Sequence, residues 1–131
     1  RTTEVYLMKA EALAYLSRWD EALNIIRENI RKRAGGGTTS SALYTSTKVA
    51  SDFATLDELI DYIQNEKRLE MVGEGKRWFD LVRTNRWKNL SKFNKGGTAE
   101  NPLVPEYQKL FPIHFVHVDE NPDYIQQNTG Y

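Results

Sequence analysis

Three glutamates, Glu66, Glu70 and Glu74, recur at every fourth residue in the middle of the chain. On a continuous helix this spacing places the three carboxylates on one face. A pair of carboxylates can act as general acid and general base in glycoside hydrolysis. Hydrolysis of a glycoside is therefore one chemical interpretation of this stretch.

Basic residues among these acids favour a different interpretation. Arg68 and Arg77 lie close to the glutamates in sequence. Asp80 lies three residues from both Arg77 and Arg83, which makes them neighbours on a helix. Because buried charges persist only when they are paired, we expect a structural ion network and no catalytic residue. Its expected members are Glu66, Arg68, Glu70, Glu74, Arg77 and Asp80.

Two helices within residues 55–85 are expected to carry this charged stretch. Thr55 and Glu58 have the spacing of a capping box, which predicts that the first helix begins here. Apolar residues then follow at helical spacing: Leu56, Leu59, Ile60 and Ile63. Gly73 and Gly75 predict a break before the second helix.

The second helix carries Trp78 and Phe79. Aromatic faces can stack on sugars, but these two side chains stand on the apolar face of a helix. We therefore expect both of them in the hydrophobic core, where aromatic residues contribute much of the buried area.

A helical hairpin is predicted for residues 1–34, because apolar residues recur there at helical spacing. Asp20 is the expected N-cap of its second helix, and the glycines at 35–37 are expected to end that helix. The turn at residues 18–22 is similar to that of a tetratricopeptide unit. One such unit cannot bury its own apolar face, so an isolated copy is expected to self-associate.

The predicted fold is mainly α: a tetratricopeptide-like hairpin packed on a further helical pair, with long loops and an extended C-terminal tail. Residues 35–54 form the expected loop, and residues 86–131 form a loop-rich tail. Binding residues concentrate in loops. The aromatic residues there are our candidates for ligand binding: Tyr44, Phe53, Trp87 and Tyr107.

Other binding chemistries find little support in the sequence. His114 and His117 are three residues apart, a spacing that places them on opposite faces of an extended strand, so we expect no metal site. The glycines at 35–37 are not followed by the Lys-Ser/Thr of a phosphate-binding loop, and we expect no cofactor.

Composition excludes several classes of protein. Eighteen basic and eighteen acidic residues balance, so no excess of positive charge indicates nucleic-acid binding. The absence of cysteine excludes disulfides and thiolate metal sites. Because the sequence starts at Arg1 without a leader, we expect a fragment of a longer protein whose targeting signal lies elsewhere.

Motifs along the chain resemble the C-terminal region of the SusD/RagB family. Residues 65–70 are similar to its N-E-R-R-x-E helix, and residues 73–81 to x-E-G-H-R-W-F-D-L, with Lys76 in place of His. Residues 127–131 are similar to Q-N-P-G-Y, with Thr129 in place of Pro. Further similarities are at residues 4–12, 26–35, 110–113 and 121–122.

The resemblance implies a non-catalytic glycan-binding lipoprotein on the outer-membrane surface of Bacteroidetes. Such a protein passes oligosaccharide to a TonB-dependent transporter of the SusC type, and many of its binding residues lie upstream. This region would supply scaffold and part of the transporter-facing surface. The alternative, from the hairpin alone, is a helical-repeat adaptor that binds only protein partners.

Overall fold

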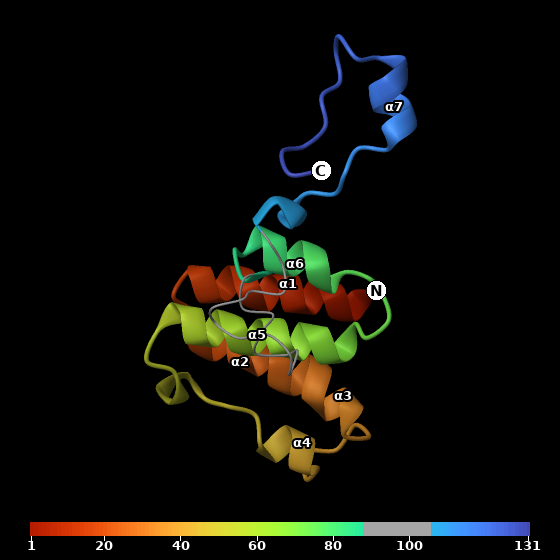
Figure 1. The fold of residues 1–131 in the computed structure, drawn as a ribbon. Coiled ribbons are helices and arrows are strands. Elements are labelled where there is room, and N and C mark those ends of the chain that lie inside the picture. Colours follow the sequence, from red (N-terminus) through yellow and green to blue (C-terminus); the bar gives the residue numbers. More distant parts are fainter. Residues whose placement is uncertain (88–105) are drawn as a thin grey trace, which may run out of the picture. The chain divides into compact units, whose positions relative to one another are not determined.

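The computed structural model describes residues 1–87 and 106–131, and every regular element in these ranges is a helix (Figure 1). This confirms the mainly α fold. The chain divides into two compact units, Arg1–Gly75 and Lys76–Tyr131, which are described separately below. Nothing in the structure tests whether the hairpin is a tetratricopeptide unit, so that likeness stays a prediction.

The first unit is built on three helical segments. Helix α1 (Thr2–Tyr15) packs against α2 (Trp19–Ile25) and α5 (Leu56–Glu70). Alanines and branched aliphatic residues fill the space between them because small side chains allow close approach of the helix backbones. The buried apolar core is Leu7, Ala10, Leu13, Ala14, Ala22, Leu23, Ile26, Ile30, Leu59, Ile60 and Ile63.

Helix α2 continues without interruption into a π-helix, η1 (Ile26–Arg31), and then into α3 (Lys32–Ala34). A π-helix closes its hydrogen bonds over one more residue than an α-helix, and short ones are frequent at functional sites. Ile26 and Ile30 stay buried within it, and Arg31 is its last residue. The sequence analysis did not predict this π-helix.

Two predicted helix starts have different outcomes. Thr55 caps α5 as predicted, since its hydroxyl accepts a hydrogen bond of 3.3 Å from the Glu58 amide. The Glu58 carboxylate accepts a hydrogen bond from the Ala54 amide at 2.8 Å. The prediction for Asp20 is wrong: α2 begins at Trp19, so Asp20 lies in the first turn. A carboxylate there still complements the positive end of the helix dipole.

The predicted loop at residues 35–54 contains two short helices, α4 (Ala42–Thr45) and the 3₁₀ turn η2 (Ala50–Asp52). Ser41 caps α4 by accepting a hydrogen bond of 3.2 Å from the Tyr44 amide. The segment is therefore more ordered than its Gly, Ser and Thr content indicated.

The second unit contains α6 (Arg77–Arg83), the 3₁₀ turn η4 (Glu106–Lys109) and α7 (Phe115–Glu120). The break at Gly73 and Gly75 is confirmed, and both glycines have positive φ. The extended tail is wrong at residues 115–120, which form α7. The expected core position of Phe79 is also wrong, because its side chain is 62% exposed and lies beside Phe111, with ring centroids 6.2 Å apart. Trp78 is half-buried.

Candidate functional site

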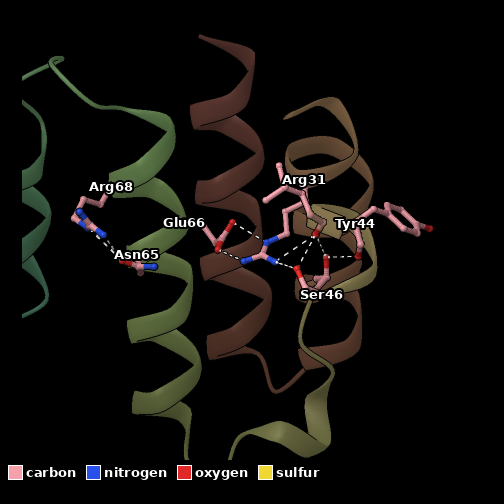
Figure 2. A network of polar contacts seen from close by, with 8 residues as sticks. Arg31, Tyr44, Ser46, Asn65, Glu66 and Arg68 are labelled. Carbon is pink, nitrogen blue, oxygen red and sulfur yellow. Dashed lines mark hydrogen bonds and ion pairs between the residues drawn. The ribbon is translucent and has the colours of Figure 1, made fainter. Parts of the chain in front are cut away.

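Arg31 and Glu66 form the most buried ion pair described in the first unit, and Figure 2 shows it at the centre of a polar network. Arg31 Nε and Nη2 donate to the two oxygens of Glu66 at 3.1 and 2.7 Å. Arg31 Nη1 donates to Ser46 Oγ at 3.2 Å and to the Leu43 carbonyl at 3.4 Å. The hydrogen bond to Glu66 raises the pKa of Arg31. The guanidinium also lies 5.6 Å from the centre of the Tyr62 ring.

The other acids of the charged stretch also form ion pairs, two of them with residues that are distant in sequence. Glu70 accepts a hydrogen bond from Arg33, and Glu74 accepts one from Arg1. Asp80 accepts one from Arg83 at 3.1 Å. Each of the three glutamates thus pairs with a cation from the hairpin, which is distant in sequence.

Membership of the network stays a prediction for Arg68 and Arg77. Arg68 donates to Asn65 Oδ1 at 2.9 and 3.1 Å, as Figure 2 shows. Arg77 is the first residue of α6 and is half-buried. Helix α5 ends at Glu70, so Glu74 does not share its face with the other two glutamates.

The pairing bears on what these carboxylates can do. Glu66 and Glu70 each form an ion pair with an arginine of the hairpin, Arg31 and Arg33 respectively. This arrangement suits the stabilisation of the fold, and the absence of a catalytic role stays a prediction.

Tyr44 and Phe53 lie in the first unit, in the segment of residues 35–54. The Tyr44 hydroxyl donates to Glu28 at 2.6 Å, and Arg27 lies 6.0 Å from its ring centre. The bond to Glu28 raises the pKa of Tyr44. Phe53 packs against Tyr62 with a centroid distance of 5.4 Å, and both candidates are half-buried.

Among the four candidates for ligand binding, Trp87 and Tyr107 differ most in solvent exposure. The Trp87 side chain is 2% exposed, so its ring faces are closed to a ligand in this conformation. Tyr107 is 38% exposed. The sequence did not predict this difference in exposure, because both residues lie in stretches of loop-like composition and burial depends on tertiary packing.

Side chains of residues 127–131 form hydrogen bonds with the backbone of residues 110–113. We call these two segments together the C-terminal clasp. The Gln127 amide group donates to the Ile113 carbonyl and accepts from the Ile113 amide, each at 2.8 Å. Asn128 Nδ2 donates to the Phe111 carbonyl at 2.7 Å. The Tyr131 hydroxyl donates to the Leu110 carbonyl at 2.9 Å. This motif at residues 127–131 was singled out from the sequence, but its hydrogen bonds were not predicted.

Tyr107 lies against the clasp. Its ring meets Tyr131 edge-on, with centroids 5.1 Å apart. Gly130 has φ +101°, and a Cβ at this position would lie 2.7 Å from the Tyr107 Cβ. Only glycine leaves room for the ring here and adopts this backbone conformation without strain.

Two surface hollows accompany these elements. One of about 510 Å³ lies beside the clasp and is lined by Glu106, Tyr107, Lys109, Leu110, Gln127, Asn128 and Thr129. The other, of about 490 Å³, lies over α1 and α2 and is lined by Lys9, Leu13, Asp20, Glu21, Asn24, Ile25 and Arg27. Aromatic side chains line the first hollow only.

The histidines do not have the strand geometry expected from the sequence. His114 caps α7, where its Nδ1 accepts a 3.4 Å hydrogen bond from Val116, and His117 lies inside the helix. Their ring centroids are 6.0 Å apart. Among residues 1–87 and 106–131, no three His, Cys, Asp or Glu side chains gather at a metal-binding distance. No helix in these ranges has the length and apolarity needed to cross a membrane.

Comparison with known proteins decides the family. The model of the SusD family matches residues 1–131. The chain belongs to the SusD family. A curated relative, the "SusD-like protein P38" of Formosa agariphila, is 32% identical over 135 residues that include the whole chain. The chain spans 24% of the length of that SusD-like relative. No solved structure matches the chain significantly.

Proposed function

We propose that this chain is the C-terminal, scaffolding part of a non-catalytic glycan-binding component of an outer-membrane nutrient uptake system. The match of the SusD family over residues 1–131 carries the proposal. The paired carboxylates on α5 support it, because their ion pairs join the hairpin to α5. Glycan binding is then a property of the full-length protein, to which this chain contributes structure.

Calorimetric titration of the full-length protein tests glycan binding. The panel consists of maltoheptaose, cellohexaose, laminarihexaose, mannohexaose and tetragalacturonate. Saturable binding of at least one of these oligosaccharides is expected, without release of shorter products on incubation. Flat titrations across the panel, or chromatographic evidence of hydrolysis, would contradict the proposal.

The proposed protein partner is a TonB-dependent transporter of the SusC type. The helical first unit would supply scaffold and part of the surface that faces the transporter. An affinity-tagged full-length protein should therefore co-purify with such a transporter from detergent-solubilised outer membranes of the source organism. Recovery of the tagged protein alone, under conditions that preserve other outer-membrane complexes, would argue against this partner.

The proposed location is the cell-surface side of the outer membrane, with a lipid anchor in a segment that precedes this sequence. Metabolic labelling of the full-length protein with a radioactive fatty acid tests the anchor. Proteolysis of intact cells tests surface exposure. A protein that takes up no label and resists external protease would overturn the proposed location.

The helical-repeat adaptor is the second candidate function. It is favoured by the hollow over α1 and α2, whose lining includes Lys9, Asp20, Glu21 and Arg27 and would suit a charged peptide. The adaptor hypothesis expects flat glycan titrations together with a reproducible protein partner whose binding fails in Arg27→Glu. Binding of an oligosaccharide by the full-length protein would decide in favour of the first function.

A further inference from the structure

The hollow beside the C-terminal clasp combines an accessible aromatic ring with polar side chains. Its volume of about 510 Å³ lies within the usual range of small-molecule sites, roughly 300–1,000 Å³. Tyr107 and Leu110 provide apolar surface, and the other lining side chains are polar. Sugars need this combination, because a pyranose ring has C–H faces and a rim of hydroxyl groups.

The aromatic ring is held in place before any ligand arrives. Tyr131 contacts the Tyr107 ring edge-on, and the Gly130 backbone lies against it. The Tyr131 hydroxyl is itself fixed by its hydrogen bond to the Leu110 carbonyl. A ring that is already ordered loses little conformational entropy on binding, which favours affinity.

The polar groups of the hollow divide into two kinds. The Gln127 side-chain amide forms hydrogen bonds with the Ile113 backbone through both its oxygen and its nitrogen, so its role in the hollow is structural. The Lys109 ammonium and the Thr129 hydroxyl have no partner among the described residues of the chain, and both residues are exposed. They are the groups available to donate hydrogen bonds to a ligand.

The charge of the lining limits the class of ligand. Glu106 and Lys109 carry opposite charges, so the hollow has no excess of either sign. Glu106 has a further interaction within the chain, and its carboxylate still repels an anionic ligand that approaches Lys109. A neutral ligand meets no such repulsion.

We propose that this hollow is a subsite for one pyranose ring of a neutral oligosaccharide. A C–H face of the sugar stacks on Tyr107, whose π-face carries partial negative charge. Lys109 and Thr129 donate hydrogen bonds to the sugar hydroxyls. The subsite rests on the proposed glycan-binding function and adds a contact within this chain to those supplied by the rest of the full-length protein.

Calorimetry of the full-length protein with the neutral oligosaccharide that it binds from the panel above tests the subsite. Tyr107→Ala should weaken binding about fivefold, as the loss of one aromatic contact predicts. Tyr107→Phe keeps the ring and should retain affinity. Lys109→Ala, at an exposed position, should weaken binding about threefold through the loss of one hydrogen bond.

Tyr124→Ala is the matched control, because Tyr124 is an aromatic residue of the same unit as Tyr107, is 90% exposed and lies outside the hollow. It should leave affinity unchanged. If Tyr107→Ala fails to fold, Lys109→Ala decides, and unchanged affinity in that variant overturns the subsite. Unchanged affinity in both Tyr107→Ala and Lys109→Ala overturns the subsite and leaves the proposed function intact. If the wild-type protein binds no glycan of the panel, both proposals fail.

Discussion

Arg31 and Glu66 stand 35 residues apart in sequence and form two hydrogen bonds with each other. Arg31 ends the π-helix, and Glu66 lies on α5 with a side chain only 5% exposed. The remaining Arg31 donor group bonds to Ser46 and Leu43 of the intervening segment. One guanidinium therefore ties three parts of the first unit together.

The first prediction concerns this pair. Glu66→Gln should lower the free energy of unfolding by about 3 kcal/mol, because it leaves a largely buried guanidinium without its counter-charge. Urea denaturation of the 131-residue chain, followed by circular dichroism, measures the change. Glu21→Gln is the control. It breaks the exposed Arg18–Glu21 pair and should have a much smaller effect, because solvent screens both charges. Equal effects of the two variants would contradict the prediction.

The second prediction concerns pH. Hydrogen bonds from Tyr44 and Lys32 lower the pKa of Glu28. A carboxylate with a lowered folded-state pKa stabilises the fold above its unfolded pKa, and this contribution is lost as pH falls through the folded pKa. Tyr44→Phe should move the Glu28 midpoint upward, as measured by carboxyl ¹³C NMR. An unchanged midpoint would show that the Tyr44 hydroxyl does not determine it.

The same contact predicts an effect at alkaline pH with the opposite sign. Glu28 raises the pKa of Tyr44, so the stabilisation is present below the unfolded pKa of the phenol and is lost as pH rises through the folded value. Glu28→Gln should lower the midpoint of Tyr44 ionisation. Ultraviolet difference titration of wild type and variant, each against a Tyr44→Phe background, isolates this residue.

The third prediction concerns Gly130. Gly130→Ala should loosen the clasp, because the new Cβ collides with Tyr107 and the positive φ costs about 1–3 kcal/mol for a non-glycine residue. Amide hydrogen exchange should accelerate at Ile113 and Asn128, both of which donate to Gln127. In a Tyr107→Gly background the additional acceleration should shrink, since the Tyr107 atoms that the new Cβ meets, including the Tyr107 Cβ, are gone. If Gly130→Ala accelerated amide exchange equally with and without the Tyr107 side chain, backbone strain alone would explain the acceleration.

The fourth prediction concerns the start of α5. Thr55→Ala removes the side-chain acceptor for the Glu58 amide and should cost about 1 kcal/mol of stability. Thr55→Ser keeps the hydroxyl and should retain most of that stability. Urea denaturation compares the two variants, and a Thr55→Ser loss as large as that of Thr55→Ala would rule out the capping explanation.

The fifth prediction concerns self-association of the isolated chain. Three large apolar side chains of α1 are exposed, Val5, Met8 and Tyr15, as is Leu16, which follows the helix. Exposed apolar patches favour association. Multi-angle light scattering should therefore report species larger than the 15.2 kDa monomer, and Met8→Glu should shift them toward it. A monomeric wild-type chain at high concentration would contradict this prediction.

Local signals in the sequence predicted much of the fold. The capping residue Thr55 and the glycines Gly73 and Gly75 act through neighbouring backbone, so the start of α5 and the break after it could be predicted. Asp20 failed as a cap because Arg18, two residues earlier, occupies that position. Boundaries of this kind shift by one or two residues without changing the helix.

Long-range relationships could not be predicted from local patterns. The identity of the cations facing Glu66 and Glu70 depends on the packing of the hairpin on α5, which brings Arg31 and Arg33 to them. The same limitation applies to the candidate site: Trp87 is buried and Tyr107 is accessible, although both have loop-like neighbours in sequence.

The π-helix has a consequence for how this sequence can change in evolution. Each residue of an α-helix turns the chain by about 100°, so one inserted or deleted residue rotates everything beyond it by that angle. A π-helix instead holds one extra residue in its hydrogen-bonded turn, so deletion of one residue between Ile26 and Arg31 would restore α-helical hydrogen bonding and leave the basic residue facing Glu66. Homologues with a gap at this position should therefore keep an unbroken α-helix here together with the buried ion pair.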